Sequence, residues 1–300
     1  MKASLSCALL LALAPLAMGA PADPSSPAAA PVATPAATPD PVRAAAQAWL
    51  AAHGLACNPD TFVAQAATAG QDTVAQFLAA GLDPDCRDAH GTPALVSALS
   101  GWKNLARPEF NPYRDKLVND RLEVLELLLA RGADPSLRDR QGFQAIHHAA
   151  EYEPFWPAVE LLKRAGADLE SETFEYRLKP LHLAVIANNA FGAKALLSAG
   201  AASNGDADPV MAPLPNAVRA DRPLMVAVLL HFGADLKRPL PGQVSCLHLA
   251  AEKASLRTIR VLVEAGADRT ALDAQQRTPQ DIARAKGRGP EVLAALAPAS

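Results

Sequence analysis

The sequence has 300 residues, and its 28 lysines and arginines against 31 aspartates and glutamates give a net charge of −3. A chain this close to neutrality has no general excess of positive charge for nucleic acid or an anionic membrane, so we expect neither partner. Beyond the N-terminal leader, no segment is long and apolar enough to span a bilayer.

The N-terminus has the layout of a secretory signal peptide. Its start is positive, residues 8–18 are almost wholly apolar, and small residues follow. Cleavage near Gly19 or Ala22 fits the small-x-small rule, and the sequence does not choose between them. We therefore expect residues 1–22 to be a leader and the mature protein to be periplasmic or secreted. A cytosolic protein with an apolar start by chance is the alternative.

A linker and a first helix follow the leader. Residues 23–41 are rich in proline and alanine, which predicts an extended, disordered segment. Asp40 can cap a helix that runs over residues 42–53 before a closing glycine. We expect this helix to shield the first face of the folded domain, predicted over residues 42–298.

The rest of the chain repeats a glycine at a nearly constant spacing. Successive intervals are 51, 34, 34, 33 and 33 residues, between Gly81, Gly132, Gly166, Gly200, Gly233 and Gly266. Residues 246–254 predict one short helix, and apolar residues at helical spacing over 256–263 predict a second that ends at the glycine. Neither helix is long enough to be stable alone, so the units must stack.

This period resembles that of the ankyrin-repeat family. The motif residues that carry the resemblance are 145–150 (AIHHAA), 179–184 (KPLHLA), 245–250 (SCLHLA), Thr92-Pro93 and Thr278-Pro279. The match covers roughly residues 58–298. It implies an all-α solenoid of about seven helix-turn-helix repeats, with short hairpin fingers and degenerate terminal repeats.

The motif histidines are interpreted as structural. In the family this histidine serves local hydrogen bonding, which the resemblance implies for His147, His182 and His248. Packed helices lie about 8–10 Å apart, so histidines of adjacent repeats cannot share one ion at a bond length of about 2 Å. We expect no metal and no cofactor.

One insertion breaks the period. About 18 extra residues fall near positions 100–119, between the helices of the second repeat, and include Trp102, Phe110 and Tyr113. An aromatic turn over residues 151–157 occupies the same place in the next repeat, so the two should be neighbours. We expect either that these rings cover one another or that they form a contact site at this edge.

A modified finger over residues 170–177 is the second departure from the pattern. Its exposed aromatic and arginine side chains predict a partner contact on the concave side, with packing on an adjacent finger as the alternative. The predicted concave contacts are Arg138, Arg140, Phe143, Phe174, Tyr176, Arg177, Asn188, Asn189, Arg219, Glu252 and Lys253.

Three cysteines remain after the leader. In an oxidising compartment Cys57 and Cys86 could form a disulfide, or both could stay free. Cys246 replaces the motif proline, which favours a buried free thiol.

The sequence has no recognisable catalytic spacing and no phosphate-binding glycine loop, so we expect no enzyme. We predict a monomeric, non-catalytic scaffold of the bacterial cell envelope that binds or protects another protein, of the stress-defence or toxin-immunity type. One alternative is a secreted effector that binds host or competitor proteins. The other is an enzyme with the insert over residues 100–119 as its lid.

Overall fold

The computed structural model describes residues 40–68, 70–100, 113–205 and 212–298. The chain divides into two units, Met1–Thr38 and Pro39–Ser300. The predicted leader and nearly all of the predicted linker lie outside the described residues. The helices are α1 (Pro41–Ala52), α2 (Pro59–Thr68), α3 (Gln71–Ala79), α4 (Ala94–Leu99), α5 (Arg114–Ala130), α6 (Ala145–Glu151), η3 (Glu153–Phe155), α7 (Trp156–Arg164), α8 (Pro180–Ile186), α9 (Ala190–Ser198), α10 (Pro213–Arg219), α11 (Pro223–His231), η4 (Pro241–Gln243), α12 (Cys246–Lys253), α13 (Leu256–Glu264), α14 (Pro279–Ala285) and α15 (Pro290–Leu296).

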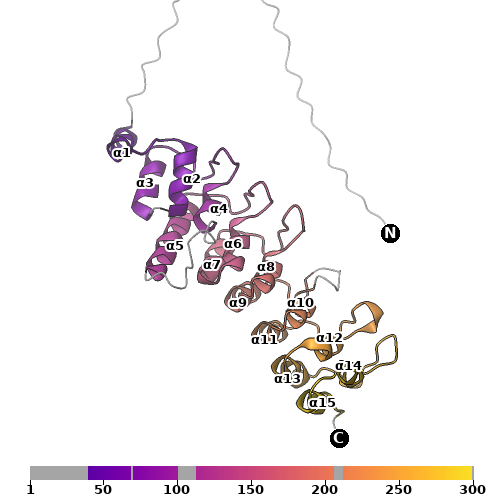
Figure 1. Ribbon diagram of the computed structural model, residues 1–300. Helices are drawn as coiled ribbons and strands as arrows, with labels where there is room; N and C mark the ends of the chain where they lie inside the picture. The colour runs from indigo at the N-terminus through magenta and orange to yellow at the C-terminus, as the bar shows by residue number, and fades with distance from the viewer. Residues whose placement is uncertain (1–39, 69, 101–112, 206–211, 299–300) are drawn as a thin grey trace, which may run out of the picture. The chain divides into compact units, whose positions relative to one another are not determined.

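Within the described residues, α2 to α15 form seven consecutive helix pairs, and α1 packs on α3 of the first pair. The first helix of each pair carries an even number, and these helices, from α2 to α14, form an inner layer (Figure 1). The second helices, with odd numbers from α3 to α15, form an outer layer. Loops that join one pair to the next project as fingers beside the inner layer. The predicted all-α ankyrin solenoid is confirmed, and no strand interrupts it in the described part of the chain.

The repeated glycines end the outer helices as the sequence predicts. Gly166 has φ +94° and Gly266 has φ +90°, in the left-handed region that favours glycine. The next residue then donates its N–H back across the last turn, as from Ala267 to the Leu262 carbonyl at 3.0 Å. This bond satisfies a carbonyl at the end of a helix too short to be stable without its neighbours.

The core lies between the two helical layers. In α13 the predicted apolar stripe is confirmed, because Ile259 and Leu262 are fully buried and Leu256 and Val263 are partly buried. The same pattern recurs along the stack, so every repeat covers the apolar face of the next repeat. No helix of the described chain is long and apolar enough to cross a membrane.

The motif histidines link consecutive repeats. The Ser245 N–H donates to His248 Nδ1 at 3.2 Å, and His248 Nε2 bonds the Arg277 carbonyl at 2.9 Å. His147 makes the same pair of bonds, to the Gln144 N–H and the Ser171 carbonyl, both at 3.1 Å. The structural interpretation of His147 and His248 is therefore confirmed, and His182 Nδ1 accepts the Lys179 N–H at 3.1 Å as the local part of the same pattern.

Part of the predicted insertion is helical. Helix α5 has 17 residues, whereas α9, α11 and α13 have nine, so residues 114–119 extend an outer helix instead of forming a loop. The buried Arg121 anchors this extension by donating to the carbonyls of Ala98 and Ser100 at 3.2 and 3.1 Å. Burial lowers the pKa of Arg121. Residues 101–112 lie outside the described residues.

Candidate functional site

The finger between α5 and α6 is a rigid turn. One carboxylate oxygen of Asp139 accepts the N–H groups of Gln141 and Phe143, each at 2.9 Å. The Asp139 N–H also donates to the Phe143 carbonyl at 2.9 Å. These bonds close the turn around Gly142, whose φ is +86°. The finger is therefore fixed by its own backbone before it meets its neighbours.

Arginines join this finger to those on either side. Arg87 Nη1 donates to the Arg138 carbonyl at 2.5 Å, and Arg138 Nη1 donates in turn to the Glu172 carbonyl. Each of the two arginines also bonds a carbonyl within its own finger. Arg140 reaches back to the Ala89 carbonyl at 2.9 Å. Three successive fingers are thus tied together, and Arg138, predicted as a contact residue, is half-buried and mainly structural.

The next finger is a tight hairpin that leans on the one before it. The Thr173 N–H donates to the Leu178 carbonyl at 3.1 Å, which closes the hairpin. At its tip, the Phe174 N–H donates to the Gln141 carbonyl at 3.1 Å. The Phe174 ring lies 5.7 Å from the Arg138 guanidinium carbon, a cation–π distance. The ring therefore packs on the adjacent finger, as one of the two alternatives predicted, and is still 62% exposed. The partner contact stays a prediction.

The rest of this hairpin tip faces solvent. Tyr176 is 67% exposed, and a hydrogen bond from its hydroxyl to Glu175 raises its pKa. Arg177 Nε pairs with Glu172 Oε2 at 2.7 Å, and its φ of +49° places it at the turn of the hairpin. An aromatic ring, a hydroxyl and a guanidinium are therefore held together at an exposed tip, which we call the fingertip (residues 174–177).

A ladder of rings runs from the fingers along α6. Phe143 stacks on His148 at 5.3 Å, and His148 stacks on Tyr152 at 6.2 Å between centroids. Phe143 also lies 5.7 Å from His147. Burial lowers the pKa of His147 to about 4, so its imidazole is neutral at pH 7. No role was predicted for His148, which is the middle ring of these three.

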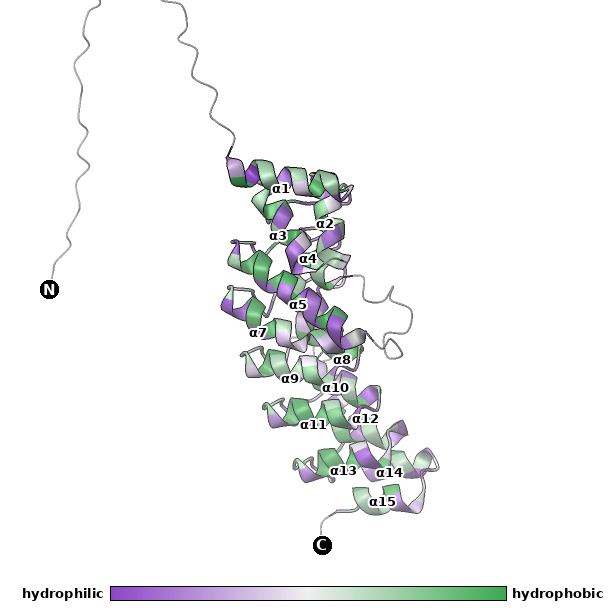
Figure 2. Cartoon of the chain, turned by 90° about the vertical axis from the view of Figure 1, so that its left-hand side faces the viewer, coloured by the Kyte–Doolittle hydropathy of each residue, from purple (hydrophilic) through white to green (hydrophobic). Residues whose placement is uncertain are grey.

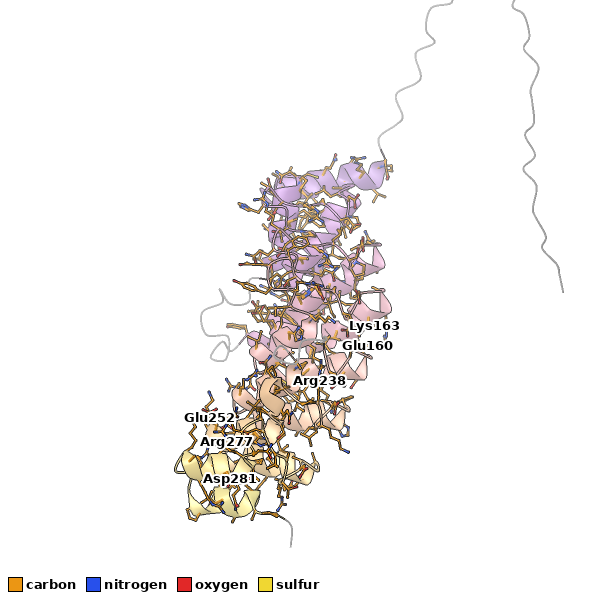
Figure 3. All side chains as sticks on the ribbon, turned by 90° about the vertical axis from the view of Figure 1, so that its right-hand side faces the viewer. Glu160, Lys163, Arg238, Glu252, Arg277 and Asp281 are labelled. Atoms are coloured by element: carbon orange, nitrogen blue, oxygen red, sulfur yellow. The ribbon has the colours of Figure 1, made fainter. Side chains whose placement is uncertain are left out.

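The remaining predicted concave residues lie at the other end of the inner helices, away from the fingers. Asn188 is exposed with φ +58°, Arg219 is half-buried at the end of α10, and Lys253 is exposed at the end of α12. Glu252, labelled in Figure 3, pairs with Lys286 at 2.8 Å. The predicted concave contacts therefore fall into two groups, one at the fingers and one at the far ends of the inner helices.

Asn189 corrects one prediction. Its side chain is 4% exposed; Oδ1 accepts the Gly192 N–H and Nδ2 donates to the Ala150 carbonyl, each at 2.8 Å. It caps α9 and joins two repeats, so the structure assigns it to the stack and not to a partner surface.

The predicted edge site is only partly described. Trp102 and Phe110 lie outside the described residues, and Tyr113 is 69% exposed just before α5. As predicted, this region adjoins the aromatic turn, since α5 contacts η3. Trp156, which belongs to the aromatic turn, is exposed here, and so is Phe191, which was missed as a contact candidate. An apolar residue at the solvent-facing start of an outer helix was the available signal.

The cysteines are free thiols in this structure, Cys57 exposed, Cys86 half-buried and Cys246 buried. Burial raises the pKa of Cys86 and of Cys246 to about 11, with Asp83 and Asp85 adding to the effect at Cys86. Both thiols are therefore protonated at neutral pH and weakly reactive. The Cys57–Cys86 bridge stays a prediction.

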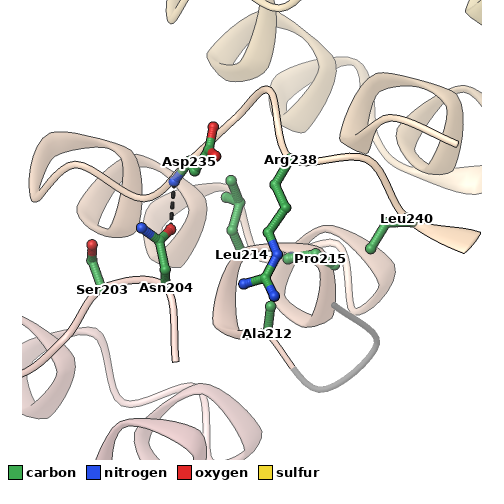
Figure 4. A pocket seen from close by; sticks show the side chains of 8 residues that line it. All are labelled: Ser203, Asn204, Ala212, Leu214, Pro215, Asp235, Arg238 and Leu240. Atoms are coloured by element: carbon green, nitrogen blue, oxygen red, sulfur yellow. Dashed lines mark hydrogen bonds between the residues drawn. The ribbon is translucent and has the colours of Figure 1, made fainter. Parts of the chain in front are cut away.

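A small cavity lies in the fifth repeat, which is one of those without the motif histidine. Pro215 stands at that position, and the Arg238 side chain extends beside it (Figure 4). Nearby, the Asp235 N–H donates to Asn204 Oδ1 at 2.6 Å. The cavity holds about 10 Å³, roughly the room one water needs. It is too small for a substrate, and the described residues contain no cluster of metal-ligating side chains.

Comparison with known proteins agrees with this geometry. Residues 117–208 match the family model for ankyrin repeats in three copies, and residues 243–274 match that for a single ankyrin repeat. Mouse cyclin-dependent kinase 4 inhibitor B is 31% identical over 114 residues, which cover 73% of that protein and 38% of this chain. This chain belongs to the ankyrin-repeat family.

Longer ankyrin-repeat proteins match more of the chain. The mouse B-cell lymphoma 3 protein homolog is 33% identical over 168 residues, which cover 55% of this chain and only 37% of that relative. The solved ankyrin-repeat domain of Bcl-3 has a TM-score of 0.61 and 26% identity, and the match covers 78% of this chain and 96% of that domain. Ankyrin repeats mediate protein–protein interaction, and this chain carries such an array.

Proposed function

We propose that this protein is a non-catalytic binding protein of the bacterial cell envelope that holds or protects a partner protein through its fingertip. The carrying observation is the exposed trio of Phe174, Tyr176 and Arg177 on a hairpin that is hydrogen-bonded to the adjacent finger. Aromatic and arginine side chains dominate the energetics of protein interfaces. Because backbone bonds and Arg138 already order the backbone of the finger, binding loses little loop entropy.

The comparisons support a protein partner in general terms. One relative is by name an inhibitor of cyclin-dependent kinase 4. The envelope location rests on the predicted leader over residues 1–22 alone. Stress defence and toxin immunity are the two roles that fit an exported ankyrin protein.

Co-purification from the native envelope fraction tests the proposal. Wild type is compared with a Tyr176→Ala, Arg177→Ala double variant and with a Glu252→Ala, Lys253→Ala double variant at the other predicted group. The control is Leu272→Ala, which removes a 46% exposed side chain on the last finger. We expect the first variant alone to lose the partner. Recovery of every partner by that variant removes the fingertip from the binding site.

Fractionation tests the location independently. A mature chain confined to the periplasm supports the envelope role, whereas export into the medium supports the secreted effector. A chain found only in the cytosol contradicts both.

A further inference from the structure

The outer layer carries a groove that the fingertip does not use. Two adjoining hollows of 530 and 390 Å³ share Trp156 and Phe191 as lining residues. The first lies between the start of α5 and the aromatic turn, and the second lies between α7 and α9. In Figure 2 these outer helices follow one another down the face of the stack. We call the combined surface the outer groove.

Core packing does not account for the aromatic residues of this groove. Trp156 is 47% and Phe191 is 54% exposed, whereas the nearby Phe155 and Ala158 are completely buried in the core. Phe191 and Leu224 each lie nine residues before the glycine of their repeat, and so occupy equivalent positions in consecutive repeats. Leu224 is likewise 59% exposed at the equivalent position of the next repeat. Exposed aromatic side chains that line a shared hollow indicate an interaction site.

The charges of the groove are mainly negative. Asp115 and Glu153 line the first hollow, whose described lining contains no basic side chain. The second hollow adds Glu160 and Lys194. Glu160 pairs with Arg164 at 3.0 Å on the exposed face of α7, which reduces its contribution. The first hollow thus has two carboxylates, whereas the second combines the apolar Phe191 and Ala195 with one acidic and one basic side chain.

We propose that the outer groove binds an arginine- or lysine-bearing apolar segment of a partner protein. The cationic head lies on the Trp156 ring and between the carboxylates of Asp115 and Glu153, since tryptophan is the strongest cation–π acceptor. The aliphatic stem and neighbouring apolar residues of the segment cover Phe191 and Leu224. This proposal does not depend on the fingertip. Either proposal can be wrong while the other holds.

Selection from a random peptide library tests the chemistry of the occupant. The full chain is panned against displayed peptides, and binders are sorted by their loss on a Trp156→Ala, Phe191→Ala double variant. We expect the dependent peptides to be rich in arginine or lysine beside leucine, valine or phenylalanine. Dependent peptides that are acidic or uncharged, or a library with no dependent peptide, overturn the proposal.

A synthetic copy of the best selected peptide then tests the residues one by one. We expect Trp156→Ala and Glu153→Lys each to weaken its binding about tenfold or more, and added salt to weaken it further. The matched exposed control Leu272→Ala, outside the groove, should leave the affinity within about twofold. Equal loss in Leu272→Ala contradicts a specific groove. The fingertip variant Tyr176→Ala, Arg177→Ala should bind the peptide as wild type does.

Two other occupants give distinct results. If a second copy of the chain fills the groove, sedimentation shows self-association that Trp156→Ala abolishes. If residues 101–112 fill it, the peptide binds only after that segment is replaced by glycine and serine. Either result overturns the proposal.

Discussion

Replacement of Gly142 by alanine tests whether the close approach of two fingers holds the fingertip in place. Gly142 has φ +86°, and a Cβ there would lie 2.5 Å from the Phe174 backbone nitrogen and 2.7 Å from its Cγ. The nitrogen cannot rotate away, so the fingertip must move. The left-handed alanine costs about 1–2 kcal/mol. Loss of the Phe174–Gln141 hydrogen bond adds about 1 kcal/mol, and loss of the cation–π contact about 0.5 kcal/mol.

Gly132→Ala is the matched control. Its φ is +87°, and a Cβ there meets nothing within 4 Å. It carries the same backbone penalty without the clash. In urea unfolding we therefore expect Gly142→Ala to lose about 1–2 kcal/mol more than Gly132→Ala. Gly142→Ala should also lower partner recovery, whereas Gly132→Ala should not. Equal destabilisation of the two variants would refute the argument that the fingers support each other.

Three further predictions concern contacts that only the folded stack forms. Asp221 accepts bonds from Ser255 and from the buried Thr258 across two repeats, so Asp221→Ala should lower the urea-unfolding free energy by about 2 kcal/mol. Below pH 6.5 the unfolded chain protonates His147, whereas in the folded protein the histidine stays neutral down to about pH 4. The free energy of unfolding should therefore fall as the pH drops from 6.5 to 4. His147→Gln should flatten this part of the stability profile. Arg121→Ala leaves two carbonyls without their donor, so its melting temperature should fall well below that of the exposed Arg131→Ala; an equal melting temperature would show that the anchor is dispensable.

The repeat architecture could be predicted because its signals are local. A glycine that ends a helix, an apolar stripe and a motif histidine each act within a few residues, and the period repeats them. The boundaries of α12 and α13 accordingly agree with the predicted segments to within a residue or two. Local signals also identified the modified finger as a departure, although they left open whether its aromatic residues pack or protrude.

The candidate surfaces depended on contacts between residues far apart in the sequence. Arg138 was predicted to contact a partner, but in the folded stack it donates to the carbonyl of Glu172, which lies 34 residues later in the sequence. Asn189 is buried because it reaches Ala150 in the preceding repeat. Trp156 and Phe191 line one groove only because α7 and α9 pack side by side in the folded chain.

The sequence by itself therefore determined that this chain is a stack of helix pairs and where each pair begins and ends. The tertiary structure alone decided which side chains bind the stack together and which remain exposed for a partner. The physical reason is that helix periodicity and capping are encoded within one repeat, whereas burial and charge pairing arise from the meeting of two or three repeats.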